Sequence, residues 1–278
     1  MKSLELLKIG GLKLEKFPSG KIDSMELLIY SSNLSKIDIL KNIEIGEDEK
    51  AKYLECIERR LNGEPIQKIL GGSEFLGVTI SFNDKTLSPR QETEILADLA
   101  IKDINNIGKV LSVLDLCSGS GCIGLAIKKH TTAKVTVSDI SDFAISHIEE
   151  NSKRNNIEVD IIKSDMFNNI SGSFDIIISN PPYLKTEELL NLEKEVELFD
   201  PKLALDGGAD GLYFYKEISN NIKTKLNVGG NLYLEIHYLL GNETKKLFEN
   251  KFENVKIIKD YGGRDRFVVC YNRKEILW

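Results

Sequence analysis

Helical segments alternate regularly with short, almost wholly apolar strands from about residue 91 onward, and this pattern limits the fold more than any other feature. Such strands are typical of a parallel sheet with helices on both faces, because neither face then meets water. The expected strands are 110–116, 134–138, 160–163, 174–179 and 230–236, and the expected helices are 92–104, 123–129, 141–155, 212–226 and 242–252. Segments 255–259 and 266–271 flank a glycine-containing turn and are predicted to form an antiparallel hairpin at one edge. The pattern predicts an α/β fold with a mostly parallel sheet.

The first 70 residues lack this alternation and are predicted to form short helices. One helix is expected to begin at the N-cap pair Asp23-Ser24, and an amphipathic helix is expected over 47–61, closed by Asn62-Gly63. Residues 73–88 then change to alternating apolar and polar positions, with turn residues at Gly77 and Asn83-Asp84. This pattern is typical of a β-hairpin, which is expected to connect the helical part to the α/β part.

The composition argues against several classes of protein. The chain is 41% hydrophobic and 29% charged, as in ordinary globular proteins, and no apolar run approaches the roughly 18 residues of a membrane-spanning helix. The N-terminus has no apolar signal region, so a cytoplasmic protein without membrane contact is expected. The 4 cysteines form no C-x-x-C pair, which argues against a zinc or disulfide framework, and no metal is expected.

The distribution of charge bears on the partner. The formal net charge is −6, and residues 1–70 hold 12 Lys and Arg against 12 Asp and Glu, so the negative excess lies in 71–278. Proteins that bind nucleic acid usually carry a basic surface that replaces the counterions of the phosphate backbone. Direct nucleic-acid binding is therefore not expected.

A glycine-rich turn joins the strand at 110–116 to the next helix. Gly119, Gly121 and Gly124 fit G-x-G-x-x-G, and Asp139 lies 20 residues beyond Gly119, where dinucleotide-binding folds place a ribose-binding carboxylate. Asp115 at the strand end helps to distinguish between two candidate ligands, a dinucleotide and S-adenosylmethionine. An extra carboxylate would repel a pyrophosphate in a site of low dielectric, which disfavours a dehydrogenase. The cationic ammonium and sulfonium groups of S-adenosylmethionine suit an acidic strand end.

Acidic residues follow three successive strands at the sheet edge where open α/β folds bind ligands. Besides Asp115, Asp139 is expected to accept hydrogen bonds from both ribose hydroxyls, and Asp165 from the adenine amine. Met166 or Phe167 is expected to pack on the adenine face. Any one of these acids could be an N-cap or a turn former. Together they predict a site for S-adenosylmethionine, with S-adenosylhomocysteine as the product.

The strand at 174–179 ends in Asn180-Pro181-Pro182-Tyr183, a segment that bears on the methyl acceptor. Each proline keeps the residue before it out of the helical region, so the segment is locked in an extended form. Neither proline has an N–H, so their carbonyls are expected to be free acceptors beside the Asn180 side-chain oxygen. Tyr183 adds an aromatic wall.

A planar –NH₂ group is a poor nucleophile because its lone pair is delocalised. Two acceptors that hold its N–H bonds would orient that lone pair toward a methyl donor, so that orientation and electrostatics replace a strong base. Asn180, Pro181 and Tyr183 are therefore the expected catalytic residues. The expected acceptor is an amide or an exocyclic amine.

With these motifs, the chain resembles the glutamine-N5 methyltransferases that modify the Gly-Gly-Gln motif of peptide chain release factors. The resemblance covers nearly the whole chain and includes Pro89-Arg90-Gln91-Glu92-Thr93-Glu94. Amine methyltransferases that act on DNA share Asn-Pro-Pro-Tyr but typically lack this element. The other matching segments are 23–28, 60–67, 71–77, 200–205, 208–212 and 260–266.

The resemblance implies a Rossmann-like, seven-stranded methyltransferase sheet with a small all-α N-terminal domain. Its expected limits are 1–70 for the helical substrate-docking domain, 71–90 for a β-hairpin linker and 91–278 for the methyltransferase domain. Peptide chain release factors are the implied partners, and a monomer is expected. The residues expected to bind the cofactor are Asp115, Cys117, Ser118, Gly119, Ser120, Gly121, Asp139, Asp165, Met166 and Asn180. Those expected to bind the substrate are Arg90, Glu92, Asn180, Pro181, Pro182 and Tyr183.

Two departures from the family pattern lead to further expectations. Cys117 stands where the family commonly has glycine, which predicts that this position does not need a positive φ. His237 follows Glu235-Ile236 where the family usually has glycine. It is a candidate acid or base, but a packed or solvated histidine is the favoured interpretation.

Three alternatives stay open from the sequence. A glutamine methyltransferase of a ribosomal protein would use the same chemistry. An exocyclic-amine methyltransferase of DNA or ribosomal RNA is disfavoured by the neutral N-terminal region. The third is a cofactor-binding partner protein without catalysis, against which the intact Asp115, Asp139, Asn180 and Tyr183 argue.

Overall fold

The computed structural model describes residues 1–81, 86–192 and 194–275, and for Lys194 it describes the backbone alone. The chain forms two compact units. One comprises Met1–Gly72 together with the segment that carries α9 (Lys194–Phe199), and the other comprises Ser73–Leu192 and the chain from Asp200 onward. In the described part of the chain, no helix is both long and apolar enough to cross a bilayer.

The first unit packs short helices around an apolar core. Its helices are α1 (Ser3–Lys13), α2 (Gly20–Ser32), α3 (Lys36–Leu40), α4 (Glu47–Leu61) and α5 (Ile66–Leu70). The core includes Leu6 of α1, Leu27 of α2 and Ile57 of α4, all fully buried. The limits of α4 agree with the prediction, because its apolar residues recur with the helical period and the chain turns at Asn62 and Gly63.

The helix α2 begins at Gly20, before the predicted start at Asp23-Ser24. Both residues are buried and bond to α4. The Asp23 carboxylate accepts a hydrogen bond from Arg60 Nε at 2.8 Å, and Ser24 Oγ lies 2.7 Å from the Tyr53 hydroxyl. These two polar side chains resemble an N-cap pair in the sequence, but they serve contacts between helices.

A two-stranded hairpin, β1 (Gly72–Phe75) and β2 (Val78–Ser81), follows the helices. Leu76 and Gly77 form its turn, with φ of 45° and 77°, as a tight hairpin turn requires. Asn83-Asp84, which were predicted to end the hairpin pattern, lie outside the described residues. From Ser73 onward the hairpin belongs to the larger unit, where Asn151 of α8 (Asp142–Asn155) accepts a hydrogen bond from Ser81 N at 2.9 Å.

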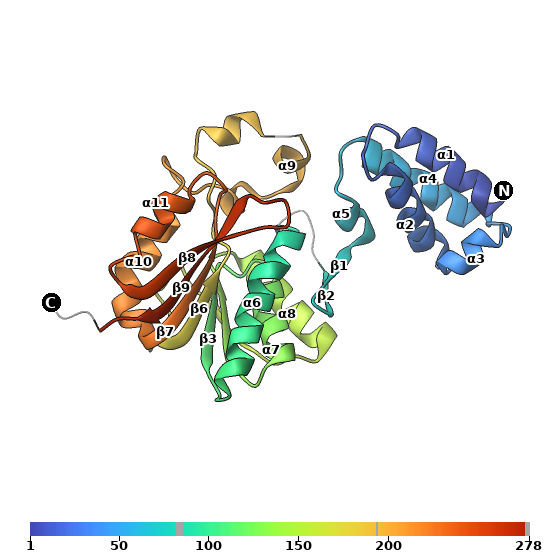
Figure 1. The fold of residues 1–278 in the computed structure, drawn as a ribbon. Helices are drawn as coiled ribbons and strands as arrows, with labels where there is room; N and C mark the ends of the chain where they lie inside the picture. Colours follow the sequence, from blue (N-terminus) through green and yellow to red (C-terminus); the bar gives the residue numbers. More distant parts are fainter. Residues whose placement is uncertain (82–85, 193, 276–278) are drawn as a thin grey trace. The chain divides into compact units, whose positions relative to one another are not determined.

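The larger unit contains a seven-stranded sheet with the order β5-β4-β3-β6-β7-β9-β8 (Figure 1). Its strands are β3 (Ser112–Leu116), β4 (Lys134–Asp139), β5 (Asp160–Lys163), β6 (Phe174–Ser179), β7 (Leu226–Glu235), β8 (Phe252–Lys259) and β9 (Asp265–Arg273). The strands β3 to β7 pair with one another in parallel, and β9 is antiparallel to both β7 and β8. The predicted mostly parallel sheet, with an antiparallel pair at one edge, is confirmed.

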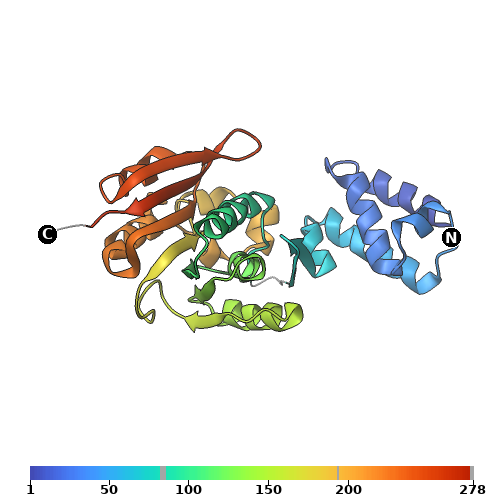
Figure 2. The ribbon, with the colours of Figure 1, turned by 60° about the horizontal axis from the view of Figure 1, so that its bottom comes forward.

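Helices cover both faces of this sheet. On one face lie α6 (Gln91–Ile107), α7 (Cys122–His130) and α8, drawn in green, and on the other lie α10 (Tyr213–Lys225) and α11 (Gly241–Lys246), drawn in orange (Figure 1). The turned view in Figure 2 shows the same two layers. Successive strand residues face opposite cores, as Val113 packs with α6 and α7 whereas Leu114 packs with α10.

The chain between β6 and α10 forms short elements that the periodicity of the sequence does not predict. They are η1 (Glu188–Asn191), α9 and η2 (Lys202–Ala204). Each is too short for an apolar pattern to repeat, so its sequence carries no helical signal. The helix α11 ends at Lys246, earlier than the predicted 252, because Phe252 already pairs with Arg273 as the first residue of β8.

Candidate active site

Parallel pairing aligns the carboxyl ends of four strands at one edge of the sheet. In the ladders that join β4, β3, β6 and β7, the last paired residues are Ser138, Leu116, Ser179 and Leu234. Cys117, Asp139, Asn180 and Glu235 follow them directly and therefore meet at the same edge. Open α/β sheets bind their ligands at this edge, because loops and helix N-termini converge there.

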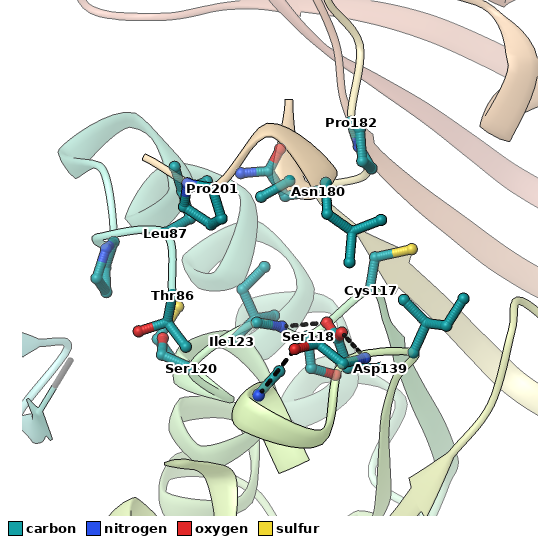
Figure 3. Close-up of a pocket in the computed structure, with 18 of the residues that line it drawn as sticks. Thr86, Leu87, Cys117, Ser118, Ser120, Ile123, Asp139, Asn180, Pro182 and Pro201 are labelled. Carbon is teal, nitrogen blue, oxygen red and sulfur yellow. Dashed lines mark hydrogen bonds between the residues drawn. The ribbon is translucent and has the colours of Figure 1, made fainter. Parts of the chain in front are cut away.

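A pocket of about 500 Å³ opens at this edge, within the larger unit (Figure 3). This volume is in the range of small-molecule sites, roughly 300–1,000 Å³. In Figure 3, Asn180, Pro182 and Pro201 lie along one side, and Ser118 and Asp139 lie along the opposite side. The predicted site residues that line the pocket are Arg90, Cys117, Ser118, Gly119, Ser120, Asp139, Asp165, Met166, Asn180 and Pro182.

Other predicted site residues are absent from the described lining of the pocket. They are Asp115, Gly121, Pro181, Tyr183 and Glu92. Asp115 and Pro181 are buried, whereas Tyr183 and Glu92 are half-buried. Gly121 has a φ of 79° and is the N-cap of α7, where a Cβ would lie 3.1 Å from Ile148. All of them except Asp115 are next in sequence to a residue that lines the pocket.

The turn after β3 requires left-handed backbone at Cys117, which has a φ of 60°. The expectation that the cysteine marks a position without positive φ is therefore wrong. This conformation costs a non-glycine residue roughly 1–2 kcal/mol. The Cys117 thiol packs in the apolar wall, 3.9 Å from Met166 Sδ. Burial raises the pKa of the Cys117 thiol above its usual range and that of Cys122 to about 12, so both thiols are neutral.

Asp115 supports the glycine turn from beneath instead of facing the pocket. It is fully buried, and its Oδ2 accepts a hydrogen bond from Gly124 N at 2.8 Å. Burial raises its pKa to about 7. A Cβ at Gly124 would lie 2.3 Å from Val137 Cγ1, so the helix α7 needs glycine to approach β4 this closely. The carboxylate and the glycine together fix the first turn of α7 against the sheet.

Asp139 ends β4 and lines the pocket. Its Oδ2 accepts from Gly119 N and its Oδ1 accepts from Ser141 N, each at 2.9 Å. Burial raises the pKa of this carboxyl, and the hydrogen bonds from backbone N–H groups oppose the shift. Each carboxylate oxygen keeps a further lone pair after these bonds, so Asp139 can still accept from two hydroxyl groups of a ligand.

The segment after β5 contributes Asp165 and Met166 to the pocket. Met166 has a φ of 45°, and this left-handed position brings its side chain beside Cys117. Phe167 is buried in the core on the α10 side and is not a lining residue among those described. Of the two side chains predicted to pack on an adenine ring, Met166 lines the pocket, and its role there remains a prediction.

Asn180 leaves β6 with its side chain at the pocket. Its Nδ2 donates to Thr93 Oγ1 at 3.3 Å, and Thr93 Oγ1 donates to Glu235 Oε2 at 2.7 Å. Within the described residues, Asn180 Oδ1 receives no hydrogen bond. Pro182 lines the pocket beside it. The site therefore presents an unsatisfied amide oxygen on a rigid segment.

Tyr183 and His237 pack together outside the lining, with ring centroids 6.0 Å apart. Burial raises the pKa of Tyr183 to about 12 and lowers the pKa of His237, so both rings are neutral near pH 7. His237 also packs on Tyr238, at 4.6 Å, and its Nδ1 accepts from Leu239 N. The packed histidine favoured by the sequence interpretation is observed.

Arg90 and Glu92 lie at the start of α6. Arg90 lines the pocket, and its Nη2 donates to Asp200 Oδ2 at 2.5 Å. This ion pair joins the loop before α6 to the loop that carries η2 within the larger unit. Glu92 is half-buried beside the pocket. The substrate-binding role expected for both residues remains a prediction.

Thr93 and Glu235 were not singled out by the sequence analysis, although both contribute to the site. Thr93 is a polar residue on the helix face that carries Leu96, Ala97 and Ala100, and it is only 2% exposed. Glu235 follows the apolar run Leu232-Tyr233-Leu234 at the end of β7 and is 1% exposed. The sequence signal that could have revealed both residues is a polar side chain among apolar residues that form the core. The pocket lining also includes Ile140 of the loop before α8, Phe143 of α8, Leu203 of η2 and Tyr213 of α10, for which the sequence carried no such signal.

Comparison with protein families agrees with this geometry. Residues 92–196 match the model described as the methyltransferase small domain, and residues 5–71 match the PrmC N-terminal domain. The two matches fall on the α/β part and on the N-terminal helices, respectively.

Relatives match over nearly the full chain. The chain is 34% identical to the release factor glutamine methyltransferase of Chlamydia trachomatis serovar L2, over 93% of this chain and 89% of the relative. It is 35% identical to that of Thermodesulfovibrio yellowstonii, over 94% of this chain and 96% of the relative.

Among solved structures, a methyltransferase from Pyrococcus furiosus superposes with a TM-score of 0.53 at 20% identity, over 78% of this chain and 98% of that one. This likeness concerns the fold alone. Identity above 30% over more than nine-tenths of the chain goes further, and the chain belongs to the release factor glutamine methyltransferase family.

Proposed function

We propose that the protein transfers the methyl group of S-adenosylmethionine to the side-chain amide nitrogen (N5) of the glutamine in the Gly-Gly-Gln motif of peptide chain release factors. One observation carries the chemistry, namely the free oxygen of Asn180 at the pocket beside a segment locked by two prolines. The names of the relatives support the identity of the substrate.

The pocket fits S-adenosylmethionine. Asp139 is held by two backbone N–H groups and keeps lone pairs for ribose hydroxyls. A Cβ at Gly119 would meet nothing within 4 Å, so the turn leaves open space on the pocket side. Met166, Ile140 and Phe143 add apolar surface for a ring. When bound, the cofactor supplies an electrophilic methyl group on a sulfonium.

The residues of this chain orient the acceptor amide. Asn180 Oδ1 accepts one N–H of the glutamine –NH₂, and the carbonyl of Pro181 accepts the other. Held in this way, the nitrogen presents its lone pair out of the amide plane and toward the cofactor side of the pocket. Positioning of reacting groups can supply a large part of a rate enhancement, so no strong base is required. The extra proton of the methylated nitrogen then passes to water.

The experiment is tritiated-methyl transfer from S-adenosylmethionine to three purified substrates: a release factor, the same factor with its Gly-Gly-Gln glutamine changed to alanine, and a ribosomal protein. Incorporation into the first substrate alone is expected. Label in the alanine version, or preferential label in the ribosomal protein, would contradict the proposed acceptor.

A matched variant tests the orientation mechanism. Asn180→Ala should lose at least about 100-fold in kcat, the scale seen when one oriented hydrogen-bonding group is removed from an active site. Its affinity for S-adenosylmethionine, measured by calorimetry, should stay largely intact. Full turnover in this variant would refute the role of Asn180.

The N-terminal residues 1–70 are proposed to dock the release factor, with 71–90 as linker and 91–278 as the methyltransferase domain. The observed division falls between Gly72 and Ser73, so the hairpin strands belong largely to the larger unit. Of these ranges, 82–85, 193 and 276–278 lie outside the described residues. A monomer that makes no direct contact with nucleic acid is part of the same proposal.

A further inference from the structure

We propose that Thr93 and Glu235 are positioning residues that fix the Asn180 side-chain amide with its oxygen toward the pocket. The inference rests on the proposed function, because it explains how the acceptor for the glutamine –NH₂ acquires its orientation. Neither residue is proposed to touch the substrate.

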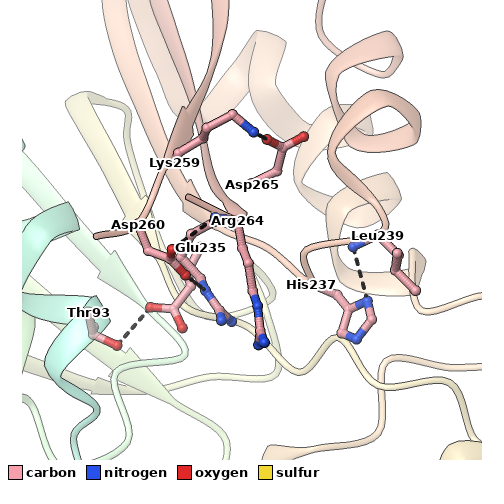
Figure 4. Close-up of polar contacts among 9 residues, drawn as sticks. Thr93, Glu235, His237, Leu239, Lys259, Asp260, Arg264 and Asp265 are labelled. Carbon is pink, nitrogen blue, oxygen red and sulfur yellow. Dashed lines mark hydrogen bonds and ion pairs between the residues drawn. The ribbon is translucent and has the colours of Figure 1, made fainter. Parts of the chain in front are cut away.

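The three side chains form a chain of hydrogen bonds across two elements and one loop. Thr93 lies in the first turn of α6, Glu235 ends β7, and Asn180 follows the neighbouring strand β6. The Asn180 Nδ2 to Thr93 Oγ1 distance is 3.3 Å, and the Thr93 Oγ1 to Glu235 Oε2 distance is 2.7 Å. Figure 4 shows the second of these bonds, with Thr93 reaching from α6 toward Glu235.

The directions of these two hydrogen bonds follow from the single proton of the Thr93 hydroxyl. An ionised carboxylate can only accept, so the single hydroxyl proton of Thr93 goes to Glu235. The Thr93 oxygen then offers only lone pairs to Asn180, and only the –NH₂ end of the amide can bond to it. The oxygen of Asn180 must therefore point the other way, where it receives no hydrogen bond within the described residues.

The oxygen and –NH₂ ends of the Asn180 amide are nearly equal in shape. Without this constraint, rotation of the side chain can exchange them. The rotated form would present an –NH₂ group to the –NH₂ of the substrate, so that donor faces donor. Burial strengthens the constraint, because Thr93 and Glu235 are only 2% and 1% exposed and little water can compete for their hydrogen bonds.

The strand end that carries Glu235 is itself held in place. The main-chain carbonyl of Glu235 accepts from the Tyr215 hydroxyl of α10 at 2.9 Å. On the neighbouring strand β9, Arg266 bonds to Asp260 at 3.4 Å and supplies positive charge near the carboxylate. The position of Glu235 is thus set by α10 and by pairing with Phe267 of β9, as a group that orients another side chain requires.

The test uses full-length protein with two substitutions at one position. Thr93→Val keeps the shape and removes the hydroxyl, whereas Thr93→Ser keeps the hydroxyl. Thr93→Val should lower kcat roughly ten-fold, on the scale of one lost hydrogen bond, with the Kd of S-adenosylmethionine unchanged. Thr93→Ser should restore kcat to within about three-fold of the wild type. Thr136→Val, at a buried threonine of β4 outside the described pocket lining, is the control and should keep wild-type kcat.

Equal kcat in Thr93→Val and wild type, or an equal loss in Thr93→Ser and Thr93→Val, would overturn the proposal. A second readout does not need turnover. In protein labelled at asparagine, hydrogen exchange of the Asn180 side-chain –NH₂, assigned by comparison with Asn180→Asp, should be at least about ten-fold faster in Thr93→Val. Unchanged exchange would also refute the role of Thr93. If the wild type methylates no release factor, the proposed function fails, while the exchange measurement still decides the positioning role.

Discussion

At the scale of single residues, the role of a carboxylate at the pocket depends on its hydrogen-bond partners. Asp139 and Asp115 are both carboxylates at strand ends, yet one lines the pocket and the other is fully buried beneath the turn. The difference lies in their partners, because Asp115 bonds to the backbone of α7 whereas Asp139 bonds to loop N–H groups that surround the pocket. The sequence places both at the correct edge, but side-chain direction depends on pleat and turn geometry that spacing alone does not encode.

Cys117 and Thr93 mark the same limit of sequence reasoning. A cysteine is not expected in left-handed backbone, so its φ of 60° could not be inferred from residue type. Thr93 lies inside a motif that the sequence analysis quoted, but its bond to Glu235 joins residues 142 positions apart in the chain. Long-range partners of this kind follow from strand order and register. Neither the order of the strands within the sheet nor their register can be read from one sequence.

Asp139 offers a direct test of the cofactor site. Asp139→Ala removes the acceptor for two backbone N–H groups and for the ribose hydroxyls proposed as its ligand partners. The binding free energy of S-adenosylmethionine should weaken by about 1–3 kcal/mol, the range for hydrogen bonds to a charged group. Isothermal titration calorimetry measures it, and Asp142→Ala, at an exposed acid nearby on α8, is the control. Equal affinity in Asp139→Ala and wild type would remove Asp139 from the site.

The pH dependence of folding stability should reveal Glu235. Burial raises the pKa of this carboxyl from 4.5 to about 7, so the folded state binds its proton more tightly than the unfolded chain does. The stability that Glu235 contributes is therefore present below about pH 4.5 and is lost as the pH rises toward about 7. The charged or titratable groups that act on Glu235 or respond to its charge are Arg90, Glu92, Arg266, Tyr183, Tyr215 and Cys122.

Comparison of wild type with Glu235→Gln isolates this contribution, because glutamine does not titrate. The free energy of unfolding of the wild type relative to the variant should fall by up to roughly 3 kcal/mol between pH 4.5 and pH 8, as measured by urea denaturation. Turnover should move in the opposite direction and rise through about pH 7, since ionised Glu235 sets the polarity of the hydrogen-bond chain. A stability difference that does not change with pH would contradict the raised pKa.

At the scale of elements, strong periodicity predicted type and limits well. The limits of α4, β5 and β6 agree with the sequence prediction. The helix α4 has a clear apolar period, and β6 has the apolar run Ile176-Ile177-Ile178. The segment from 184 to 211 gave no such signal. Residues far apart within this segment bond to one another, as in the hydrogen bond from Leu184 N to Leu205 O at 2.9 Å.

Two adjacent glycines in α1 give a matched test of helix packing. A Cβ at Gly10 would lie 1.9 Å from the Tyr53 hydroxyl oxygen, whereas a Cβ at Gly11 would meet nothing closer than Lys21 at 3.8 Å. Gly10→Ala should therefore destabilise the protein by about 1–3 kcal/mol through overpacking. Gly11→Ala should stabilise it by up to about 1 kcal/mol, because alanine has the higher helix propensity. Thermal unfolding measures both, and equal effects of the two substitutions would show that α1 does not pack as described.

At the scale of the whole molecule, the order of strands and helices along the chain was predictable, but their division into two compact units was predictable only in part. A boundary near residue 70 was expected, and the observed division falls at Gly72. The segment around α9 groups with the helical unit although it lies far along the chain, and Glu195 of α9 bonds to Arg60 of α4 at 3.3 Å. The sequence alone does not predict that α9 groups with the N-terminal helices, because a single ion pair between distant positions leaves no periodic pattern.

The docking role proposed for residues 1–70 can be separated from catalysis by deleting them. The pocket lies wholly within the larger unit, so the truncated protein should bind S-adenosylmethionine with unchanged affinity, and this binding serves as the control for folding. Turnover of an intact release factor should fall by at least about ten-fold in kcat/KM, because the docking contacts that position the substrate are lost. A short peptide that carries the Gly-Gly-Gln motif has no such contacts to lose, so its kcat/KM should be the same for both proteins. Equal loss on peptide and intact factor would place residues 1–70 in support of the active site, and no loss on either would contradict docking.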